Sequence, residues 1–266
     1  MDTPTPEALL KREVRSPDEV LRRAGEMLAP IADRSGGVLY SGRSTLALGN
    51  LYVMGLNPGG RTDGAGAESG TIGESLQNVC QVWSSYADDA YGQGGNPSLL
   101  QTRIRTVFEA LGADPRQTFA TNAVFVRSRN AAELAEGSDG AWDLWWKHCW
   151  PVHQLFLHVV RPRVIVCLGN GPGSAFEMLR FTGPSNGRSP TSVWPPSQDE
   201  TSASGKMRED VTLDLGDYGR HPCMVLGLPH PSPLASQYWP LTPDALAKIE
   251  KARHRIVGWE RPDPAT

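Results

Sequence analysis

The stretch LYVMGLNPGG, residues 51–60, bears most directly on the fold. It begins with a short apolar run of the kind found in buried strands. Pro58 cannot donate a strand hydrogen bond, and the glycines beside it favour a tight turn, so the strand must end there. Asn57 then lies just beyond the strand. The stretch therefore predicts a buried strand with a polar side chain at its carboxyl end.

The rest of the chain alternates between strand and helix patterns. Apolar runs predict further strands at residues 118–126, 164–168 and 223–228. Helical spacing of apolar residues predicts helices at residues 98–111 and 141–160. Such alternation favours a parallel sheet covered on both faces, with a ligand crevice beyond the carboxyl ends of the strands. The expected fold class is therefore α/β.

The length of the chain is compatible with one large domain, and we expect residues 1–266 to form it. Residues 6–29 show helical spacing, with a start signal at Ser16 and Pro17, and predict an N-terminal helical segment. Residues from about 181 to 220 begin with a run rich in Ser, Pro, Gly and Thr. We expect a flexible insertion there.

Composition and charge narrow the class of protein. The formal net charge of −3 argues against a nonspecific coat for DNA, because phosphate neutralisation needs Lys and Arg. The first 15 residues lack the apolar core of a signal peptide, and no window approaches the roughly 18 apolar residues that span a bilayer. We therefore expect a soluble, cytoplasmic protein that does not contact a membrane.

The cysteines lie far apart in the sequence. They are Cys80, Cys149, Cys167 and Cys223. They form no C-x-x-C pair and no zinc spacing with histidine, so neither a disulfide framework nor a structural metal is indicated. We expect a protein with no metal and no cofactor.

A second unusual loop follows the predicted strand at residues 223–228. It reads PHPSPL, residues 229–234, and its prolines can hold the imidazole of His230 with little reorganisation. Because the carboxyl ends of parallel strands meet at one edge of a sheet, we expect Asn57, Asn122 and His230 to share one crevice. Taken singly, these residues also fit a plain turn, a strand-end cap and a structural histidine.

Four segments resemble the uracil-DNA glycosylase superfamily. GLNPG at residues 55–59 looks like the first motif of its mismatch-specific and single-strand-selective branches, and HPSPL at residues 230–234 looks like the second motif. TNAV at residues 121–124 resembles the base-reading segment, and residues 149–169 are similar to a helix and strand of the iron-sulfur branches. The resemblance implies a three-layer α/β/α sandwich with a central four-stranded parallel sheet.

The same resemblance assigns roles in the crevice. It implies that His230 hydrogen-bonds the carbonyl oxygen of the departing base, where negative charge develops. Asn57 is expected to orient the attacking water, although an amide cannot deprotonate it. The amide of Asn122 offers a donor and an acceptor that match uracil and mismatch cytosine. Further base contacts are expected from Gly55, Leu56 and Pro58.

Contacts with DNA also follow from the resemblance. Leu234 resembles the apolar wedge that fills the gap left by an extruded base. Ser232 is expected to contact a phosphate, and Arg127 and Arg129 are expected to bind the DNA backbone. The expected partner is DNA that contains uracil or another deaminated base, bound by a monomer.

Two features depart from the family pattern. The family places a base-stacking aromatic residue shortly after the first motif, but residues 61–81 contain none, and Trp83 and Tyr86 are the nearest candidates. The iron-sulfur branches need four cysteines, of which only Cys149 lies at a familiar place. No cluster is therefore expected.

We interpret the chain as a monofunctional DNA glycosylase that hydrolyses the N-glycosidic bond of uracil, or of a related deaminated base, in base excision repair. Neither loop contains a lysine, so water rather than an amine should attack the sugar. Two alternatives stay open. One is a non-catalytic member that binds nucleic acid or a protein partner, and the other is a hydrolase of free nucleosides or nucleotides on the same fold.

Overall fold

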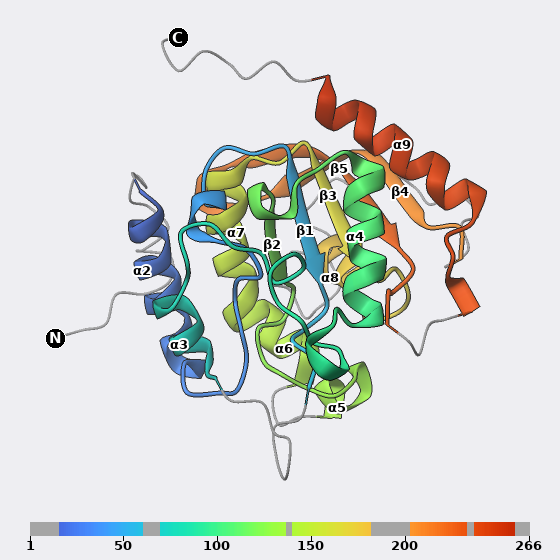
Figure 1. Cartoon of the computed structure of the whole chain (residues 1–266). Coiled ribbons are helices and arrows are strands. Elements are labelled where there is room, and N and C mark those ends of the chain that lie inside the picture. The colour runs from blue at the N-terminus through green and yellow to red at the C-terminus, as the bar shows by residue number, and fades with distance from the viewer. Residues whose placement is uncertain (1–15, 61–69, 137–139, 182–202, 233–236, 259–266) are drawn as a thin grey trace, which may run out of the picture.

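A five-stranded sheet forms the centre of the computed structural model (Figure 1). Its strands are β1 (Leu51–Gly55), β2 (Phe119–Asn122), β3 (Val164–Leu168), β4 (Lys206–Asp214) and β5 (Arg220–Leu228). Their order in the sheet is β2-β1-β3-β5-β4. The first four strands in this order run parallel, and β4 runs antiparallel to β5. The predicted α/β class is confirmed.

The structure describes residues 16–60, 70–136, 140–181, 203–232 and 237–258. Their α-helices are α2 (Pro17–Leu28), α3 (Ile72–Gln77), α4 (Leu99–Leu111), α5 (Ala131–Glu136), α6 (Gly140–Leu144), α7 (Trp150–Val160), α8 (Ala175–Arg180) and α9 (Pro243–Val257). A π-helical turn at Trp145–Cys149 joins α6 to α7. No helix within the described ranges is long and apolar enough to cross a membrane.

β4 differs from the expectation of a four-stranded, wholly parallel sheet. The prediction of a flexible insertion at about 181–220 does not hold for this strand, whereas residues 182–202 lie outside the described residues. The start of β4 carries charged residues, and a bulge lies between Arg208 and Val211. Both features, which are common in edge strands, interrupt the alternation of apolar and polar residues that would predict a strand. The buried side chains of Val211 and Leu213 then attach the strand to the core.

Several helix ends follow the signals in the sequence. α2 begins after Ser16, whose hydroxyl accepts a hydrogen bond from the Glu19 N–H at 3.3 Å. α4 ends at Gly112, whose φ of 65° lies in the left-handed region that favours glycine. α2 occupies the second half of the predicted N-terminal helical segment, and residues 6–15 lie outside the described residues.

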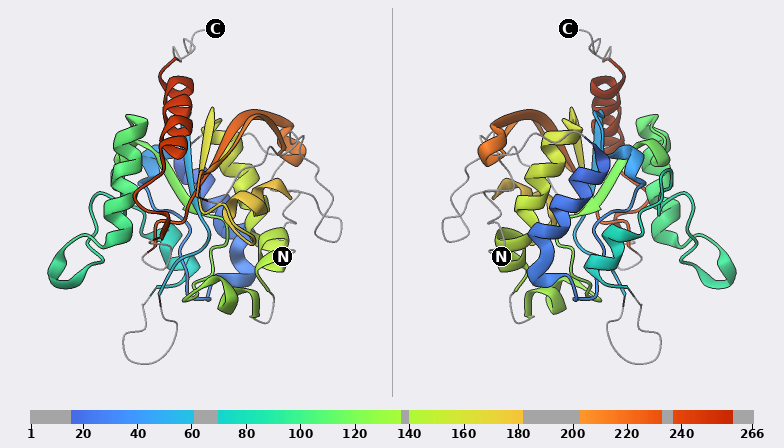
Figure 2. Two further views of the ribbon diagram at one scale, coloured as in Figure 1. Left: turned by 90° about the vertical axis from the view of Figure 1, so that its right-hand side faces the viewer. Right: turned by 90° about the vertical axis from the view of Figure 1, so that its left-hand side faces the viewer.

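Helices cover both faces of the sheet (Figure 2). α4 and α9 contribute to one buried cluster, which also holds Val53 and Val166 of the sheet. α2, α7 and α8 contribute to the other, which holds Tyr52 and Met54. Successive side chains of β1 therefore enter opposite cores, as expected for a strand buried on both faces.

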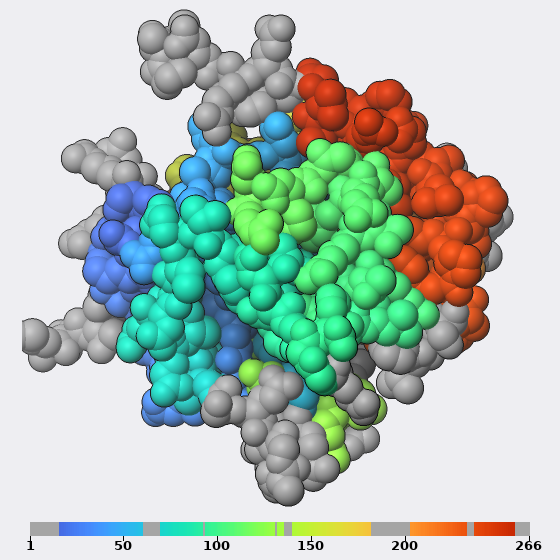
Figure 3. All heavy atoms as spheres, in the orientation of Figure 1, coloured from blue at the N-terminus to red at the C-terminus, as the bar shows by residue number. Residues whose placement is uncertain are grey.

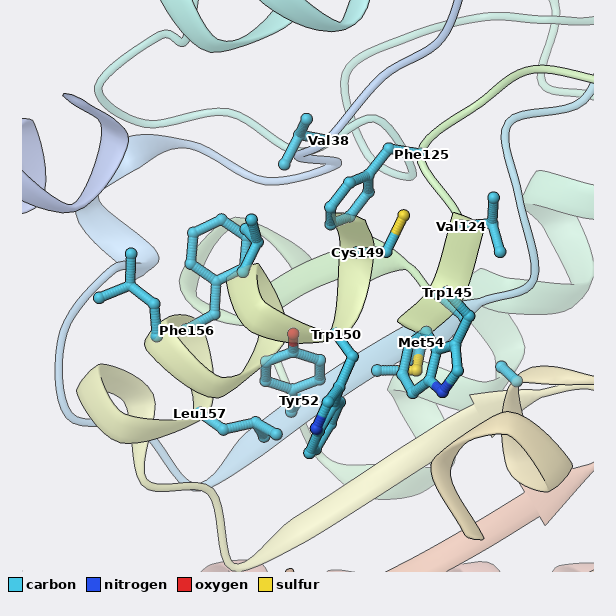
Figure 4. Close-up of a cluster of buried hydrophobic side chains, with 14 of the residues drawn as sticks. Val38, Tyr52, Met54, Val124, Phe125, Trp145, Cys149, Trp150, Phe156 and Leu157 are labelled. Atoms are coloured by element: carbon cyan, nitrogen blue, oxygen red, sulfur yellow. The ribbon is translucent and has the colours of Figure 1, made fainter. Parts of the chain in front are cut away.

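The larger core lies between the sheet and the helical segment that ends in α7 (Figure 4). Trp145 and Trp150 of this segment are almost fully buried and belong to the same cluster as Tyr52 and Met54 of β1. Their rings contact each other, with centroids 5.3 Å apart. Core packing therefore accounts for these two tryptophans of the segment.

Candidate active site

A pocket of about 350 Å³ opens at the carboxyl edge of the parallel strands. Its lining includes Gly55, Asn122 and Leu168, the last residues of β1, β2 and β3, together with His230, which follows β5. Figure 3 shows a hollow below the centre of this face, with blue atoms of the N-terminal part of the chain at its floor. The pocket thus occupies the crevice position of open α/β sheets and has the size of a small-molecule site.

The side chain of Asn57, which lines the pocket, is anchored through its nitrogen. Nδ2 donates to the Pro58 carbonyl at 2.8 Å and to the hydroxyl oxygen of Ser128 at 2.9 Å. The Ser128 hydroxyl in turn donates to the Asn130 carbonyl at 2.9 Å. These bonds fix the orientation of the amide, and Oδ1, the acceptor atom of the Asn57 side chain, can accept a hydrogen bond from a water molecule.

Asn122 presents a buried amide to the pocket. It lies opposite Gly55 in the sheet. Two hydrogen bonds of 2.8 Å continue the pairing beyond it, from the Ala123 N–H to the Gly55 carbonyl and from the Val124 N–H to the Leu56 carbonyl. Leu56 also lines the pocket. Asn122 is 5 % exposed, and its side chain makes no hydrogen bond within the described residues. A Cβ at Gly55 would overlap Oδ1 of Asn122. Glycine is therefore required there for this amide to lie where it does.

The hydrogen bonds around His230 favour one tautomer of the ring. The backbone N–H of Ser232 donates to Nδ1 at 3.2 Å. Nδ1 is therefore the acceptor, and the ring proton is assigned to Nε2. Burial lowers the pKa of His230 below its usual value, so the imidazole is neutral at pH 7. His230, which lines the pocket, therefore carries an Nε2–H donor.

Four aromatic residues line the pocket: Tyr40, Trp83, Tyr86 and Tyr91. Trp83 and Tyr86 were the candidates expected from the sequence, whereas Tyr40 and Tyr91 were not expected. Tyr40 and Tyr86 stack with ring centroids 6.1 Å apart and an angle of 26° between their planes. The Tyr91 hydroxyl donates to the Asp89 carboxylate at 2.6 Å, which restrains a ring that is 57 % exposed. These walls suit a planar, partly apolar ligand.

A fully buried histidine that the sequence analysis did not single out supports the strand end at Asn122. The Ala123 carbonyl can only accept, so His153 donates to it through Nε2 at 3.0 Å. Nδ1 then accepts a hydrogen bond of 2.8 Å from the Tyr52 hydroxyl. Burial lowers the pKa of His153 to about 4. This neutral histidine links β1, β2 and α7 directly behind Asn122.

We expect His153 to make the protein less stable in mild acid. As the pH falls from about 6.5 to about 4, the unfolded chain binds a proton at this residue and the folded chain does not, so stability is lost. The full effect is about 3 kcal/mol at 1.36 kcal/mol for each pH unit. Denaturant unfolding across this range should show a shallower pH dependence for His153→Gln than for the wild type. An identical slope in both proteins would contradict the assignment.

The residues expected to bind DNA occupy different environments. Arg127 lines the pocket and donates to the Ser35 hydroxyl at 3.2 Å. Arg129 is exposed and forms an ion pair with Glu133 at 3.1 Å. Ser232 is half-buried, and its N–H contacts His230. Leu234 lies outside the described residues, and the DNA-binding role of all four stays a prediction.

Among the described residues, no group of three or more His, Cys, Asp or Glu side chains could hold a metal ion. The absence of a metal from the whole protein stays a prediction. The hydrogen-bonding groups of the pocket lining include the neutral imidazole of His230, the amide of Asn122 with a donor and an acceptor, and the amide oxygen of Asn57.

Comparison with models of known protein families gives a match over most of the chain. The family description "Uracil DNA glycosylase superfamily" matches residues 47–252, a range that contains Asn57, Asn122 and His230. No curated protein matches the chain. Because the family match extends over more than half of the sequence, this protein belongs to the uracil-DNA glycosylase superfamily.

Proposed function

We propose that this protein is a monofunctional DNA glycosylase that hydrolyses the N-glycosidic bond of uracil, or of a related deaminated base, in DNA. Its superfamily supports a glycosylase-type activity in general. The observation that carries the finer proposal is the meeting of two groups in one pocket: the buried amide of Asn122, which makes no hydrogen bond within the described residues, and His230, whose ring proton is assigned to Nε2.

Asn122 is the group that selects the base. Its amide N–H donates to the O4 atom of uracil, and its oxygen accepts from N3–H. Cytosine presents a donor and an acceptor in the reverse order, which leaves a buried amide unpaired and is disfavoured. The link from His153 to the Ala123 carbonyl supports this role, because it holds the backbone next to Asn122.

His230 stabilises the departing base. When the bond between C1′ and the base nitrogen breaks, the electron pair leaves with the base, and negative charge spreads to its carbonyl oxygens. A preorganised Nε2–H close to O2 stabilises this anion more than the neutral starting base. The neutral tautomer of His230 supplies this donor and does not need to give up its proton.

Asn57 positions the attacking water. Water adds to C1′ of the positively charged sugar and loses a proton to solvent or to the base anion, which gives an abasic site and the free base. The bonds from Nδ2 to Ser128 and Pro58 hold the amide of Asn57 in one orientation, so Oδ1 can orient the water. An amide is not a general base, so catalysis depends more on departure of the base than on activation of water.

The aromatic lining accounts for the missing family aromatic. Tyr40 and Tyr86 stack in the wall, Trp83 is half-buried like Tyr40, and Tyr91 is exposed. We assign contact with the faces of the extruded base to this group, since stacking on aromatic side chains stabilises a flipped base. No described residue of the pocket lining is a lysine, which supports hydrolysis without a Schiff base.

The test is incubation of the protein with oligonucleotides that contain one uracil, hypoxanthine, xanthine or mismatched thymine, followed by alkali. We expect strand breaks at uracil that appear only after alkali, because a monofunctional enzyme leaves an intact abasic site. Binding of DNA without base release would favour the non-catalytic alternative. Base release from free nucleosides alone would favour the nucleoside hydrolase.

A further inference from the structure

We propose that Arg103 is a positioning residue for the reaction: it holds the loop after β5 so that the imidazole of His230 keeps its place and tautomer. This inference rests on the proposed function of His230. Arg103 lies on α4, a helix that also supplies Leu100 and Ile104 to the pocket lining. The helix that forms one wall of the pocket thereby also sets the position of the histidine.

Arg103 donates hydrogen bonds to two consecutive backbone carbonyl groups of the loop. Its Nη1 donates to the carbonyl of Pro231 at 3.2 Å and to the carbonyl of Ser232 at 2.8 Å. The carbonyl of His230 accepts a hydrogen bond of 3.2 Å from Nε1 of Trp239. The guanidinium carbon of Arg103 lies 5.3 Å from the centre of the Trp239 ring. Three successive carbonyls of the loop are thus held by one pair of stacked side chains.

The planarity of the peptide bond carries this restraint to the imidazole. The Pro231 carbonyl and the Ser232 N–H belong to the same peptide unit, which is planar, so fixing the oxygen fixes the direction of the N–H. That N–H donates to Nδ1 of His230. Holding the Pro231 carbonyl therefore keeps Nδ1 as acceptor and Nε2 as donor. Without Arg103 the peptide unit is free to rotate, and the tautomer is no longer selected.

Substitution of Arg103 should therefore act through His230. We expect Arg103→Gln to slow single-turnover base release by roughly 10- to 100-fold, since small misplacement of a catalytic group has effects of this size. In a His230→Ala background the same substitution should cause no further slowing, because the group that it positions is gone. Trp239→Phe, which keeps an aromatic ring but lacks the N–H, should give a smaller loss with the same dependence on His230.

A matched control is Arg43→Gln. Arg43 also donates twice to a backbone carbonyl, from Nε at 3.1 Å and Nη2 at 2.8 Å to Val79, and it is not part of the pocket lining. This variant should retain the wild-type rate. Thermal melting of all variants checks that they are folded. The proposal would be overturned if Arg103→Gln slowed the reaction by the same factor in the wild-type and in the His230→Ala background.

A readout that does not need activity separates this inference from the proposed function. Nitrogen-15 NMR of the histidine side chains should show His230 as the neutral Nε2–H form in the wild type and in Arg43→Gln. Arg103→Gln should shift the signals towards a mixture of tautomers. If the wild type releases no base, the proposed function fails while this test still applies. Unchanged His230 signals in both Arg103→Gln and Trp239→Phe would overturn the positioning role.

Discussion

Replacing His230 with alanine should slow the release of uracil from duplex DNA by about 10²- to 10³-fold, the usual effect of removing one preorganised donor to a developing anion. The variant loses the Nε2–H that the Ser232 N–H selects by occupying Nδ1. Asn57→Ala should slow the reaction less. Asn57 positions a water molecule that can still reach the sugar from bulk solvent, and its amide is not a base.

The measurement is the single-turnover rate with excess enzyme on a duplex that contains one uracil. Both variants must first be shown to be folded, because Asn57 also holds Ser128 through Nδ2. Near-wild-type rates for both variants would mean that the two motifs do not carry catalysis. A larger loss for Asn57→Ala than for His230→Ala would instead make activation of water the main contribution.

The part of the site at strand ends could be predicted because of a rule of sheet geometry. Parallel strands end at one edge, so polar residues at or just beyond the ends of three such strands are expected to share one crevice. β1 and β3 lie where their apolar runs predicted them, at Leu51–Gly55 and Val164–Leu168. The pocket accordingly contains Asn57, Asn122 and His230.

The aromatic wall could be predicted only in part, because tertiary contacts assemble it. Tyr40 precedes β1 in an irregular segment, and two backbone hydrogen bonds set its place. Its N–H donates to the Ala120 carbonyl at 2.8 Å, and its carbonyl accepts from the Ser85 N–H at 3.0 Å. No local pattern encodes these contacts. The supporting roles of His153 and Arg103 were missed for the same reason, since their partners lie 30 and about 130 residues away.

Two elements were missed although the sequence carries a signal for them. The stretch VTLDL at residues 211–215 alternates between apolar and polar residues, and Val211, Leu213 and Leu215 are fully buried. Thr242 followed by Pro243 is a typical helix start, and the Thr242 hydroxyl caps α9. The first signal is short and follows a run rich in Ser, Pro, Gly and Thr, which by composition indicates a loop.

Gly55→Ala should slow uracil release by about 10²-fold, although it adds only one methyl group, because a misplacement of about 1 Å can have this effect. The added Cβ would overlap Oδ1 of Asn122, so the base-reading amide must move. We also expect a loss of about 1–3 kcal/mol in the free energy of unfolding, as for other overpacked sites. Single-turnover rates and denaturant unfolding measure the two effects. Gly25→Ala is the matched control, because its Cβ would meet only Leu76 Cδ1 at 3.9 Å.

The double variant Gly55→Ala with Asn122→Ala separates this steric explanation from general damage to the site. Asn122→Ala should itself remove base recognition, and it also removes the oxygen that the new Cβ would overlap. Asn122 Cγ, which would lie 3.4 Å from that Cβ, is removed as well, and the next atom is the Thr121 carbonyl oxygen at 4.0 Å, an ordinary contact. The double variant should therefore match Asn122→Ala in rate and recover most of the stability that Gly55→Ala loses. Additive losses in the double variant would show that Gly55 matters for a reason other than the room it leaves for the amide of Asn122.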